Sequence, residues 1–502
     1  MTAMRPNILF IFSDDHNVGG ISAYEENRWQ TPNIDRIADE GMRFDRTFCA
    51  NSICTPSRAT VFSGTHSHKN GVLQLAPWYA FDPARGAVQE LLQQAGYQTG
   101  FFGKWHMASE PTGFDEWEAM TADCGQGTYY NPHFIRSAGR EPVHHQGYAA
   151  DIVTDLSIDW LERRDPDEPF ILFSHHKSPH GPWLPRLDRY GDHYDDLAIP
   201  EPATMAEDFT GRGEGTPSKD SANSLLTTTD KHHLMLTPPD DLDDETLATW
   251  KSVYEQENQD YLTRREAGTL SRAEDIRWRF QRLARNYYLT VASLDDAIGR
   301  LLDYLDDAGL RENTVVIYAS DQGFYVGDFG WYDKRYIYEI SMRMPFLVRW
   351  PGVTAPGTVN ADLTQNIDFA QTFLEIAGLD APPAMQGRSL VPLLQGETPA
   401  NWREALYYQY YGNSWRLPSH YGVRTETHKL VRFFYGVREF WELYDLVSDP
   451  DELVNLYEDP RCAAVRQELH ATLEQLRKDY EVPESDEEII ASSCRVETPV
   501  FS

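Results

Sequence analysis

Short, apolar, β-rich segments that alternate with amphipathic helical segments constrain the fold of this chain more than any other feature. The apolar segments cover residues 7–12, 170–173, 315–319 and 345–348, and residues 98–102 form a further strand-like segment. Runs of this kind predict strands that are buried on both faces of a parallel sheet. Between them, apolar residues recur at helical spacing, most clearly over 151–163 and 276–307. We therefore expect an α/β fold in which helices sandwich a large, mostly parallel sheet.

Two changes in composition divide the chain. Residues 185–270 are rich in Asp, Thr, Ser, Pro and Gly, which predicts a long surface excursion with little fixed internal structure. Nearer the C-terminus, aromatic strand-like runs, turns and a helix follow one another. We therefore expect a large α/β domain over 1–400, a smaller C-terminal α+β subdomain with an antiparallel sheet over 401–480, and an acidic tail or wrapping arm over 481–502.

Charge and cysteine content limit the class of partner. The formal net charge of -33 over 502 residues disfavours nucleic acid, whose binding needs a broad basic surface. No apolar signal segment precedes the first strand and no apolar run reaches transmembrane length, so the sequence as written predicts no membrane insertion and a cytoplasmic location. A periplasmic or secreted location stays open if a signal has been removed. The five cysteines are a sparse, odd set, which argues against a disulfide framework.

Ionisable or amide side chains follow four of the predicted strands at the point where each strand ends. They are Asp14 and Asp15, Lys104 and His106, Lys177 and His180, and Asp321 and Gln322. The carboxyl ends of parallel strands meet at one edge of a sheet, where α/β proteins bind their ligands. Three carboxylates and an amide are hard oxygen ligands, which suit calcium or magnesium better than zinc. The alternative for Asp14 and Asp15 is a solvated turn.

Cations in the same parts of the sequence complement such a metal site. Besides the lysines and histidines that follow strands, Arg58 and Lys334 are candidates. A divalent cation surrounded by lysine, arginine and histidine side chains can hold a tetrahedral oxyanion. The sequence therefore predicts a site for an anion of this shape.

Cys54 lies two residues before Pro56 and four before Arg58, at the expected start of a helix that ends at Gly64. Proline suits the first turn of a helix and glycine suits its end. Cys54 would then lie at a helix N-terminus, where unpaired N–H groups and the helix dipole favour negative charge. The alternative is a buried structural cysteine beside a helix start.

Together these motifs resemble the type I, formylglycine-dependent sulfatase family of the alkaline-phosphatase-like superfamily, and within it the N-acetylglucosamine-6-sulfatase-like carbohydrate branch. The matching motifs are Cys54-Thr55-Pro56-Ser57-Arg58, Gly103-Lys104-Trp105-His106, Ser178-Pro179-His180, Ser320-Asp321-Gln322-Gly323, Lys334-Arg335 with Tyr338-Glu339, and Glu442-Leu443-Tyr444-Asp445-Leu446. Their order and spacing match the family over essentially the whole chain. Two positions depart from the pattern, since Gln322 replaces an asparagine often seen there and Phe329 replaces a histidine.

The resemblance implies that a formylglycine-generating enzyme oxidises Cys54 to formylglycine, whose hydrate attacks sulfur on a divalent metal. Calcium is the expected metal, with magnesium and manganese as alternatives. His180, helped by Lys334, would protonate the leaving oxygen, and His106 would deprotonate the second hydroxyl so that sulfate departs. The implied metal ligands are Asp14, Asp15, Cys54, Asp321 and Gln322, and the implied catalytic residues are Cys54, Arg58, Lys104, His106, Lys177, His180 and Lys334. For Lys177, a place at the rim of the site is the alternative.

The resemblance also implies a sulfuric ester hydrolase that acts on a sulfated carbohydrate. Trp331, His420 and Arg424 are the expected substrate contacts. Trp183 and Tyr332 would join Trp331 in an aromatic platform for the sugar or, as the alternative, pack in the core. Two rival functions stay open: a phosphonate monoester hydrolase or phosphodiesterase with the same formylglycine site, and a non-catalytic glycan-binding protein. The sugar, the position of its sulfate and the oligomeric state are left open by the sequence.

Overall fold

The structure of the protein is a computed structural model. It describes residues 5–24, 27–121, 125–194, 196–212, 221–412, 417–435, 438–485 and 488. Most of the predicted tail over 481–502 therefore lies outside the described residues. Within the described part of the chain, none of the helices is both long and apolar enough to span a bilayer.

A ten-stranded sheet forms the centre of the molecule, and its middle strand is β1 (Asn7–Ser13). Both neighbours of β1 run parallel to it, namely β8 (Phe170–His175) on one side and β9 (Thr314–Ser320) on the other. Beyond β8 the parallel part continues with β4 (Gln98–Gly103) and β5 (Glu116–Met120). These apolar strands are buried because helices cover both faces of the sheet, as expected for a parallel arrangement. The predicted α/β fold is confirmed.

Antiparallel strands at both flanks make the sheet more mixed than the sequence predicted. On the β9 side, β12 (Phe346–Arg349) pairs antiparallel with β9 and with β2 (Met42–Phe44), and β13 (Thr358–Asn360) forms the edge. On the other side, β6 (His133–Arg136) and β7 (Gly139–His144) form a hairpin against β5. The central strands thus keep their carboxyl ends at a common edge.

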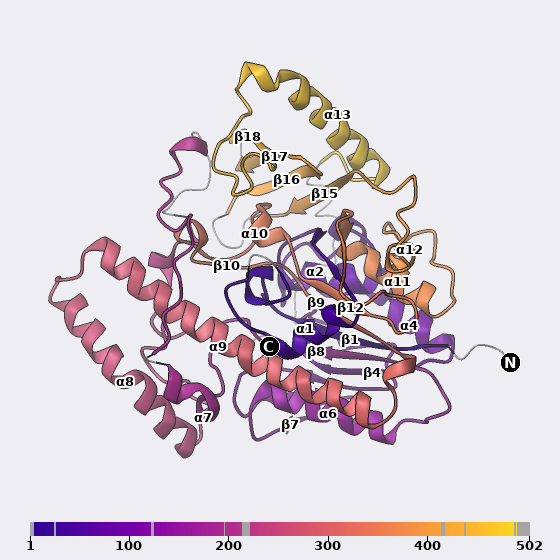
Figure 1. Cartoon of the computed structure of the whole chain (residues 1–502), viewed down its shortest axis with the longest axis horizontal. Helices are drawn as coiled ribbons and strands as arrows, with labels where there is room; N and C mark the ends of the chain where they lie inside the picture. The colour runs from indigo at the N-terminus through magenta and orange to yellow at the C-terminus, as the bar shows by residue number, and fades with distance from the viewer. Residues whose placement is uncertain are drawn as a thin grey trace.

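Helices pack on both faces of the sheet (Figure 1). On one face lie α2 (Cys54–Ser63), α4 (Val88–Gln94) and α11 (Phe369–Ile376), and on the other lie α1 (Pro32–Asp39), α6 (Ala149–Arg163) and α9 (Arg272–Asp307). Alternate residues of β1 serve the two faces, because successive strand side chains point in opposite directions. Phe10 contacts Phe373 of α11 at 5.2 Å between ring centroids, whereas Leu9 packs in the same cluster as Leu294 of α9.

The C-terminal part carries a separate four-stranded antiparallel sheet that lies above the large one in Figure 1. Its strands are β15 (Ala405–Tyr410), β16 (Ser419–Thr425), β17 (His428–Tyr435) and β18 (Arg438–Asp445), and α13 (Ala463–Asp479) covers one face. The sequence indicated all but β16. Its pattern is weak because a glycine, Gly422, and polar residues interrupt the apolar positions.

The segment over 185–270 has more fixed structure than the sequence predicted. It contains the short α7 (Leu187–Tyr190) and a long helix, α8 (Asp244–Glu266), which runs beside the N-terminal part of α9 in Figure 1. Three aromatic residues of α8, Trp250, Tyr254 and Tyr261, are buried. Three aromatic anchors among many charged residues are enough to fix a helix against a neighbour, but they give little signal in the sequence.

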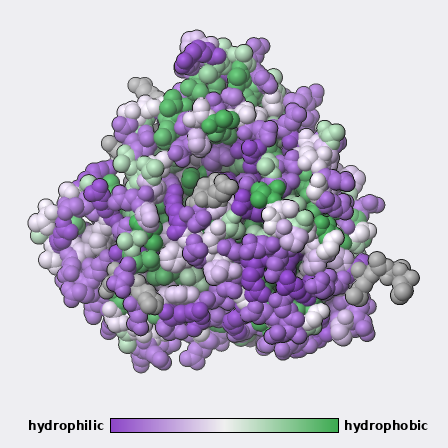
Figure 2. All heavy atoms as spheres, in the orientation of Figure 1, coloured by the Kyte–Doolittle hydropathy of each residue, from purple (hydrophilic) through white to green (hydrophobic). Residues whose placement is uncertain are grey.

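The remaining elements are short. They are α3 (Ser67–Asn70), α10 (Glu339–Met342), α12 (Val391–Leu394), β3 (Thr47–Phe48), β10 (Tyr325–Val326), β11 (Tyr332–Asp333) and β14 (Thr364–Gln365). Most of the face of the molecule shown in Figure 2 is hydrophilic, in keeping with the large net charge.

Candidate active site

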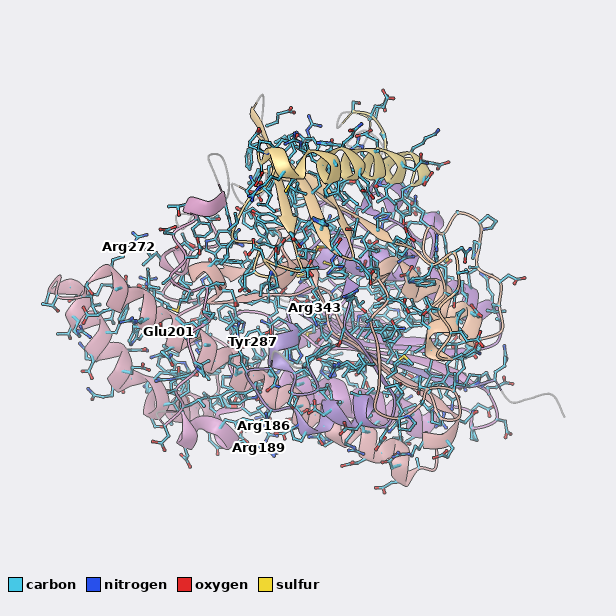
Figure 3. The ribbon with its side chains drawn as sticks, turned by 45° about the horizontal axis from the view of Figure 1, so that its top comes forward. Arg186, Arg189, Glu201, Arg272, Tyr287 and Arg343 are labelled. Atoms are coloured by element: carbon cyan, nitrogen blue, oxygen red, sulfur yellow. The ribbon has the colours of Figure 1, made fainter. Side chains whose placement is uncertain are left out.

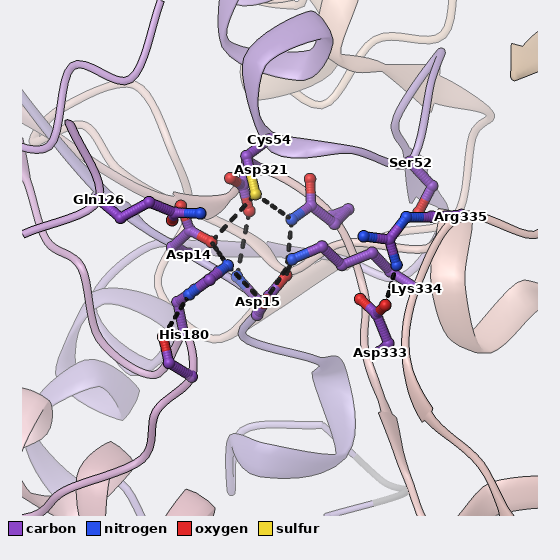
Figure 4. Close-up of polar contacts among 12 residues, drawn as sticks. Asp14, Asp15, Ser52, Cys54, Gln126, His180, Asp321, Asp333, Lys334 and Arg335 are labelled. Atoms are coloured by element: carbon purple, nitrogen blue, oxygen red, sulfur yellow. Dashed lines mark hydrogen bonds and ion pairs between the residues drawn. The ribbon is translucent and has the colours of Figure 1, made fainter. Parts of the chain in front are cut away.

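The predicted ionisable residues meet at the carboxyl edge of the central strands (Figure 4). Asp14 and Asp15 follow β1, and Asp321 and Gln322 follow the adjacent β9. The two strands end in register, since Ser13 pairs with Ser320 and the Asp321 N–H donates to the Ser13 carbonyl at 3.3 Å. The register of the parallel pair therefore places carboxylates that are some 300 residues apart in sequence side by side.

The three carboxylates form a buried cluster. One oxygen from each of Asp14, Asp15 and Asp321 lies within 4.8 Å of the other two. Two further atoms are buried without a hydrogen-bond partner among the described residues: Gln322 Oε1, and Asp321 Oδ2, which faces Arg58 Nε at 3.4 Å. Buried polar atoms are normally paired, so such atoms point to a missing partner. The oxygen-only donor set fits a hard divalent cation such as calcium or magnesium.

Asp15 reaches this cluster through a backbone conformation that a non-glycine residue rarely adopts. Its φ is 63°, in the left-handed region. Tyr287 of α9 holds the turn, since its hydroxyl donates to the Asp15 carbonyl at 2.7 Å and accepts from the Asn17 N–H at 3.0 Å. Tyr287 lies in the interior of the molecule (Figure 3) and is fully buried. The long core helix thus fixes the orientation of a candidate metal ligand.

Three cations neutralise the cluster. Arg58 Nη2 lies 2.8 Å from Asp14 Oδ2, Lys334 Nζ lies 2.6 Å from both oxygens of Asp15, and Lys104 forms an ion pair with Asp14. All three side chains are buried, so these pairs are scarcely screened by solvent. With a divalent cation added, the site would carry a net positive charge and would attract an anion.

The carboxylate pKa values follow from burial and these neighbours. Burial alone would raise the pKa of Asp14, but Lys104, His180 and Arg58 outweigh it and lower that pKa well below its usual value. Asp321 has less compensation, so burial and repulsion by Asp14 raise its pKa to about 8. Asp321 is therefore the carboxylate with most to gain from a bound cation.

Cys54 is the first residue of α2, as the sequence predicted, and Gly64 ends that helix with φ 64°. The Cys54 Sγ atom lies 3.4 Å from Asp14 Oδ1 and 3.4 Å from Gln322 Nε2. Burial, and then the charge of Asp14, raise the pKa of the thiol to about 12. A thiol in this environment stays protonated at neutral pH and is a poor nucleophile.

His180 faces the same cluster from the loop after β8. Its Nε2 atom lies 3.6 Å from Asp15 Oδ2 and 4.0 Å from Asp14 Oδ1. Its Nδ1 atom is 2.7 Å from the Gly181 carbonyl, which can only accept, so Nδ1 carries a proton. Burial, followed by the charges of Lys104 and Lys334, lowers the pKa of His180 well below its usual value, so the ring is neutral and Nε2, which points into the site, is the nitrogen that can take up a proton.

His106 and Lys177 lie nearby in different environments. His106 is buried, and burial together with the charge of Lys104 lowers its pKa well below the usual value, which leaves a neutral ring. Lys177 Nζ donates to the Gly181 carbonyl at 3.1 Å and lies 5.3 Å from the centre of the Tyr129 ring. Lys177 thus shares its acceptor with His180, which favours a place behind that histidine over contact with an anion.

A cavity of about 410 Å³ opens onto Cys54 and His180. Several of its wall residues were absent from the sequence prediction. Asp333 and Arg335 flank the predicted Lys334, and both have left-handed backbones, with φ 77° and 91°. The full lining consists of Asp15, Cys54, Leu75, Gln126, His180, Gly181, Pro182, Trp183, Ala222, Asn223, Thr229, His232, His233, Phe324, Tyr332, Asp333, Lys334 and Arg335.

Gln126 joins this wall to the cationic cluster, because its Oε1 atom accepts from Lys104 Nζ at 2.5 Å. Its position between Gly125 and Gly127, which both have positive φ, gives no motif that sequence reasoning could use. Residues between 222 and 233, which belong to the segment 185–270, also line the cavity. The composition of that segment did not indicate a site.

The three predicted substrate contacts, Trp331, His420 and Arg424, lie outside the lining of this cavity. Trp331 is fully buried and stacks on Phe209 at 5.1 Å. His420 is also fully buried, and Arg424 forms an ion pair with Glu339. His420 and Arg424 connect β16 to the segment after Lys334, through Tyr336 and Glu339, whereas Trp331 packs against Phe209 and Tyr336. The aromatic residues that do line the cavity are Trp183, Phe324 and Tyr332.

Comparison with protein families assigns nearly the whole chain. The family described as sulfatase matches residues 6–379. The family described as N-sulphoglucosamine sulphohydrolase, C-terminal, matches residues 327–479. The second match begins just before Lys334 and spans the four-stranded sheet and α13.

Individual proteins agree with these matches. The N-acetylglucosamine-6-O-sulfatase of Bacteroides thetaiotaomicron is 40% identical over 96% of this chain and 88% of the relative. The human N-acetylglucosamine-6-sulfatase is 25% identical over 90% of this chain and 81% of the relative. A solved structure of a protein in complex with its substrate D-glucosamine-2-N,6-O-disulfate superimposes with a TM-score of 0.91 at 38% identity, covering 96% of this chain and 99% of that one.

Proposed function

The chain belongs to the sulfatase family, and from this premise we propose that it removes the sulfate ester from a small sulfated amino sugar, with the 6-O-sulfate of a glucosamine derivative as the preferred group. One observation carries the proposal. This chain is 38% identical to a protein that was solved in complex with its substrate D-glucosamine-2-N,6-O-disulfate, and it has a cavity at Cys54. Its volume of about 410 Å³ lies in the range of small-molecule sites.

The metal of this site is proposed to be calcium, with magnesium and manganese as alternatives. Asp14, Asp15, Asp321 and Gln322 would hold it, together with the residue formed from Cys54. The buried Asp321 Oδ2 and Gln322 Oε1 atoms that lack hydrogen-bond partners support this assignment. When bound, the cation would supply Lewis acidity beside the nucleophile and the sulfate.

Cys54 is proposed to be the precursor of formylglycine, made by a formylglycine-generating enzyme. The high thiol pKa argues that the unmodified side chain is not the nucleophile. The hydrated aldehyde supplies two hydroxyl groups, one to attack sulfur and one whose later deprotonation releases sulfate. Arg58 and Lys104 would keep this residue and Asp14 in place through their ion pairs with Asp14.

Proton transfer is assigned to the two histidines. His180 would give its Nε2 proton to the departing sugar oxygen, with Lys334 stabilising the negative charge that develops there. His106, neutral in its buried environment, would accept the proton when sulfate is expelled. Lys177 would act behind His180 through the shared Gly181 carbonyl.

The test is a comparison of substrates with protein co-produced with a formylglycine-generating enzyme. We expect sulfate release from N-acetylglucosamine 6-sulfate and N-sulfoglucosamine 6-sulfate, and much slower release from the 3-sulfate isomer. Aryl phosphonate and phosphodiester substrates form the second arm. A higher kcat/KM for the phosphorus substrates would replace the proposal with the phosphonate hydrolase function, and absence of turnover with fully converted protein would favour glycan binding without catalysis.

A further inference from the structure

We propose that His233, which lies between η5 (Leu225–Thr227) and α8, is a specificity residue that donates a hydrogen bond from Nε2 to an acceptor oxygen of the sugar, away from the sulfate ester. This inference rests on the proposed function and adds a residue of the excursion to the substrate site.

The proton of the His233 ring is fixed by its neighbour Thr229. The Thr229 backbone N–H donates to His233 Nδ1 at 2.9 Å, and the Thr229 hydroxyl lies at the same distance. A backbone N–H can only donate, so Nδ1 must accept, and the neutral ring carries its proton on Nε2. Burial, followed by the neighbouring His232, lowers the pKa of His233 to about 4, which keeps the ring neutral at pH 7. His233 is thus a single, oriented, uncharged donor.

The ring is held between two aromatic residues of the cavity wall. Its centroid is 4.9 Å from that of Tyr332 and 5.8 Å from that of Trp183. All three side chains line the cavity. Among the described residues, His233 Nε2 has no hydrogen-bond partner, and the ring is half-buried. An occupant of the cavity is the partner that would satisfy this donor.

The backbone around His233 is anchored on the long helix α8. Arg265 of α8 makes a bidentate contact with Asp230, with N···O distances of 2.9 and 3.0 Å. Asn258 of the same helix donates to the Met235 carbonyl at 2.9 Å. The donor is therefore positioned before substrate binds, which reduces the entropy lost on binding.

The positions of the cavity residues indicate which part of the substrate would contact His233. Cys54, His180 and Lys334 come from the sheet edge and surround the place of the sulfate ester. His233 reaches the same cavity from the excursion, and it makes no contact with the carboxylate cluster. A neutral N–H donor suits a hydroxyl, an N-acyl carbonyl or an N-sulfonate oxygen, all of which are acceptors on an amino sugar.

The test compares two substitutions of His233. His233→Phe keeps the ring and its packing but removes the donor, whereas His233→Gln removes the ring and keeps an N–H donor. We measure kcat/KM with N-acetylglucosamine 6-sulfate and with 4-nitrophenyl sulfate, which lacks the sugar acceptors. For His233→Phe we expect the ratio of sugar to aryl activity to fall about tenfold, mainly through KM, as expected for the loss of one well-placed hydrogen bond. We expect His233→Gln to recover part of that ratio.

The matched control is His428→Phe, because His428 lies at the start of β17 and away from the cavity lining. Glucosamine 6-sulfate, which has a free amine, locates the acceptor. If His233→Phe leaves the ratio of sugar to aryl activity unchanged with this substrate, the acceptor is on the nitrogen substituent, and if the ratio falls about tenfold, the acceptor is a hydroxyl of the sugar. If the wild-type protein hydrolyses the sugar sulfates and His233→Phe keeps the wild-type ratio, the role of His233 is overturned alone. If the wild-type protein hydrolyses no amino-sugar sulfate, the proposed function and this inference both fail.

Discussion

At the scale of single residues, the position of one proton decides how the leaving group departs. The Gly181 carbonyl fixes a proton on Nδ1 of His180, so Nε2, which lies near the carboxylate cluster, is the only ring nitrogen that can take up a proton and pass it on. A sugar alcohol is a poor leaving group and needs that proton, whereas 4-nitrophenolate leaves readily without it. The dependence on leaving group is therefore a direct readout of the role of His180.

We predict that His180→Ala lowers kcat for N-acetylglucosamine 6-sulfate about 10²- to 10⁴-fold and lowers kcat for 4-nitrophenyl sulfate far less. Steady-state kinetics with both substrates check this, and His428→Ala is the control for loss of a distant histidine. An equal loss with both substrates would show that His180 acts in binding or folding and not as the general acid.

A second prediction concerns Asp321, which lies beside Asp14 in the buried cluster. If Asp321 ligates calcium, the wild-type protein gains thermal stability when calcium is added to chelator-treated protein, by about 2.7 kcal/mol at a calcium concentration a hundred times the Kd. We expect Asp321→Asn to weaken calcium binding at least about tenfold, because the ligand loses its charge. Without calcium the variant should be about as stable as the wild-type protein at pH 7, since burial and repulsion by Asp14 raise the pKa of Asp321 to about 8 and leave its carboxyl group largely protonated.

Differential scanning fluorimetry with a calcium titration measures this effect. Asp303→Asn is the matched control, because Asp303 is 66% exposed and pairs with Arg36 on the surface. A wild-type calcium response in Asp321→Asn would remove Asp321 from the metal site.

At the scale of elements, the long helix α9 connects the turn at Asp15 to the start of α1. Tyr287 fixes the turn at Asp15, and two turns later Asp295 accepts hydrogen bonds from the Asn33 and Ile34 N–H groups at the start of α1. Unpaired N–H groups at a helix start need such an acceptor. Burial outweighs these hydrogen bonds and raises the pKa of Asp295 to about 6.

This raised pKa predicts a pH-dependent stability. The folded protein holds the Asp295 proton more tightly than the unfolded chain does, so the stabilisation is fully present below about pH 4 and is lost as the pH rises through about 6. Relative to Asp295→Asn, the wild-type protein should lose up to about 3 kcal/mol of unfolding free energy between pH 4 and pH 7. Urea unfolding of both proteins across this range measures the difference, and a constant difference would refute the assignment.

The elements also show what the sequence can predict. β1, β8 and β9 were predicted because each is a continuous apolar run, and β4 because two phenylalanines precede Gly103. The carboxyl ends of these four strands located Asp14, Asp321, Lys104 and His180 without any tertiary information. β16 and α8 were missed because their stability comes from contacts with neighbours, such as the Tyr261–Trp278 stack at 3.6 Å, and not from a periodic pattern. Substrate contacts were the least predictable part of the site. The sequence does not tell that Trp331 is buried in the core and that His233 lines the cavity, because only the packing of the folded chain decides this.

At the scale of the whole molecule, a strongly acidic protein surrounds a charge-balanced centre that a bound divalent cation would make positive. The net charge of -33 lies largely on the surface, whereas Arg58, Lys104 and Lys334 are buried around the carboxylates. A surface of this charge repels a long polyanion, and the enclosed cavity admits a small ligand. Both features agree with a substrate the size of a single sulfated sugar.

Sulfate release from N-acetylglucosamine 6-sulfate, followed by ion chromatography, shows whether the protein is a sulfatase whose activity depends on Cys54. The protein is co-produced with a formylglycine-generating enzyme, and Cys54→Ala is prepared in the same way. We predict one equivalent of sulfate for each sugar consumed by the wild-type protein and none by Cys54→Ala. Equal sulfate release by Cys54→Ala, or no release by wild-type protein whose Cys54 is shown by mass spectrometry to be converted, would contradict the account.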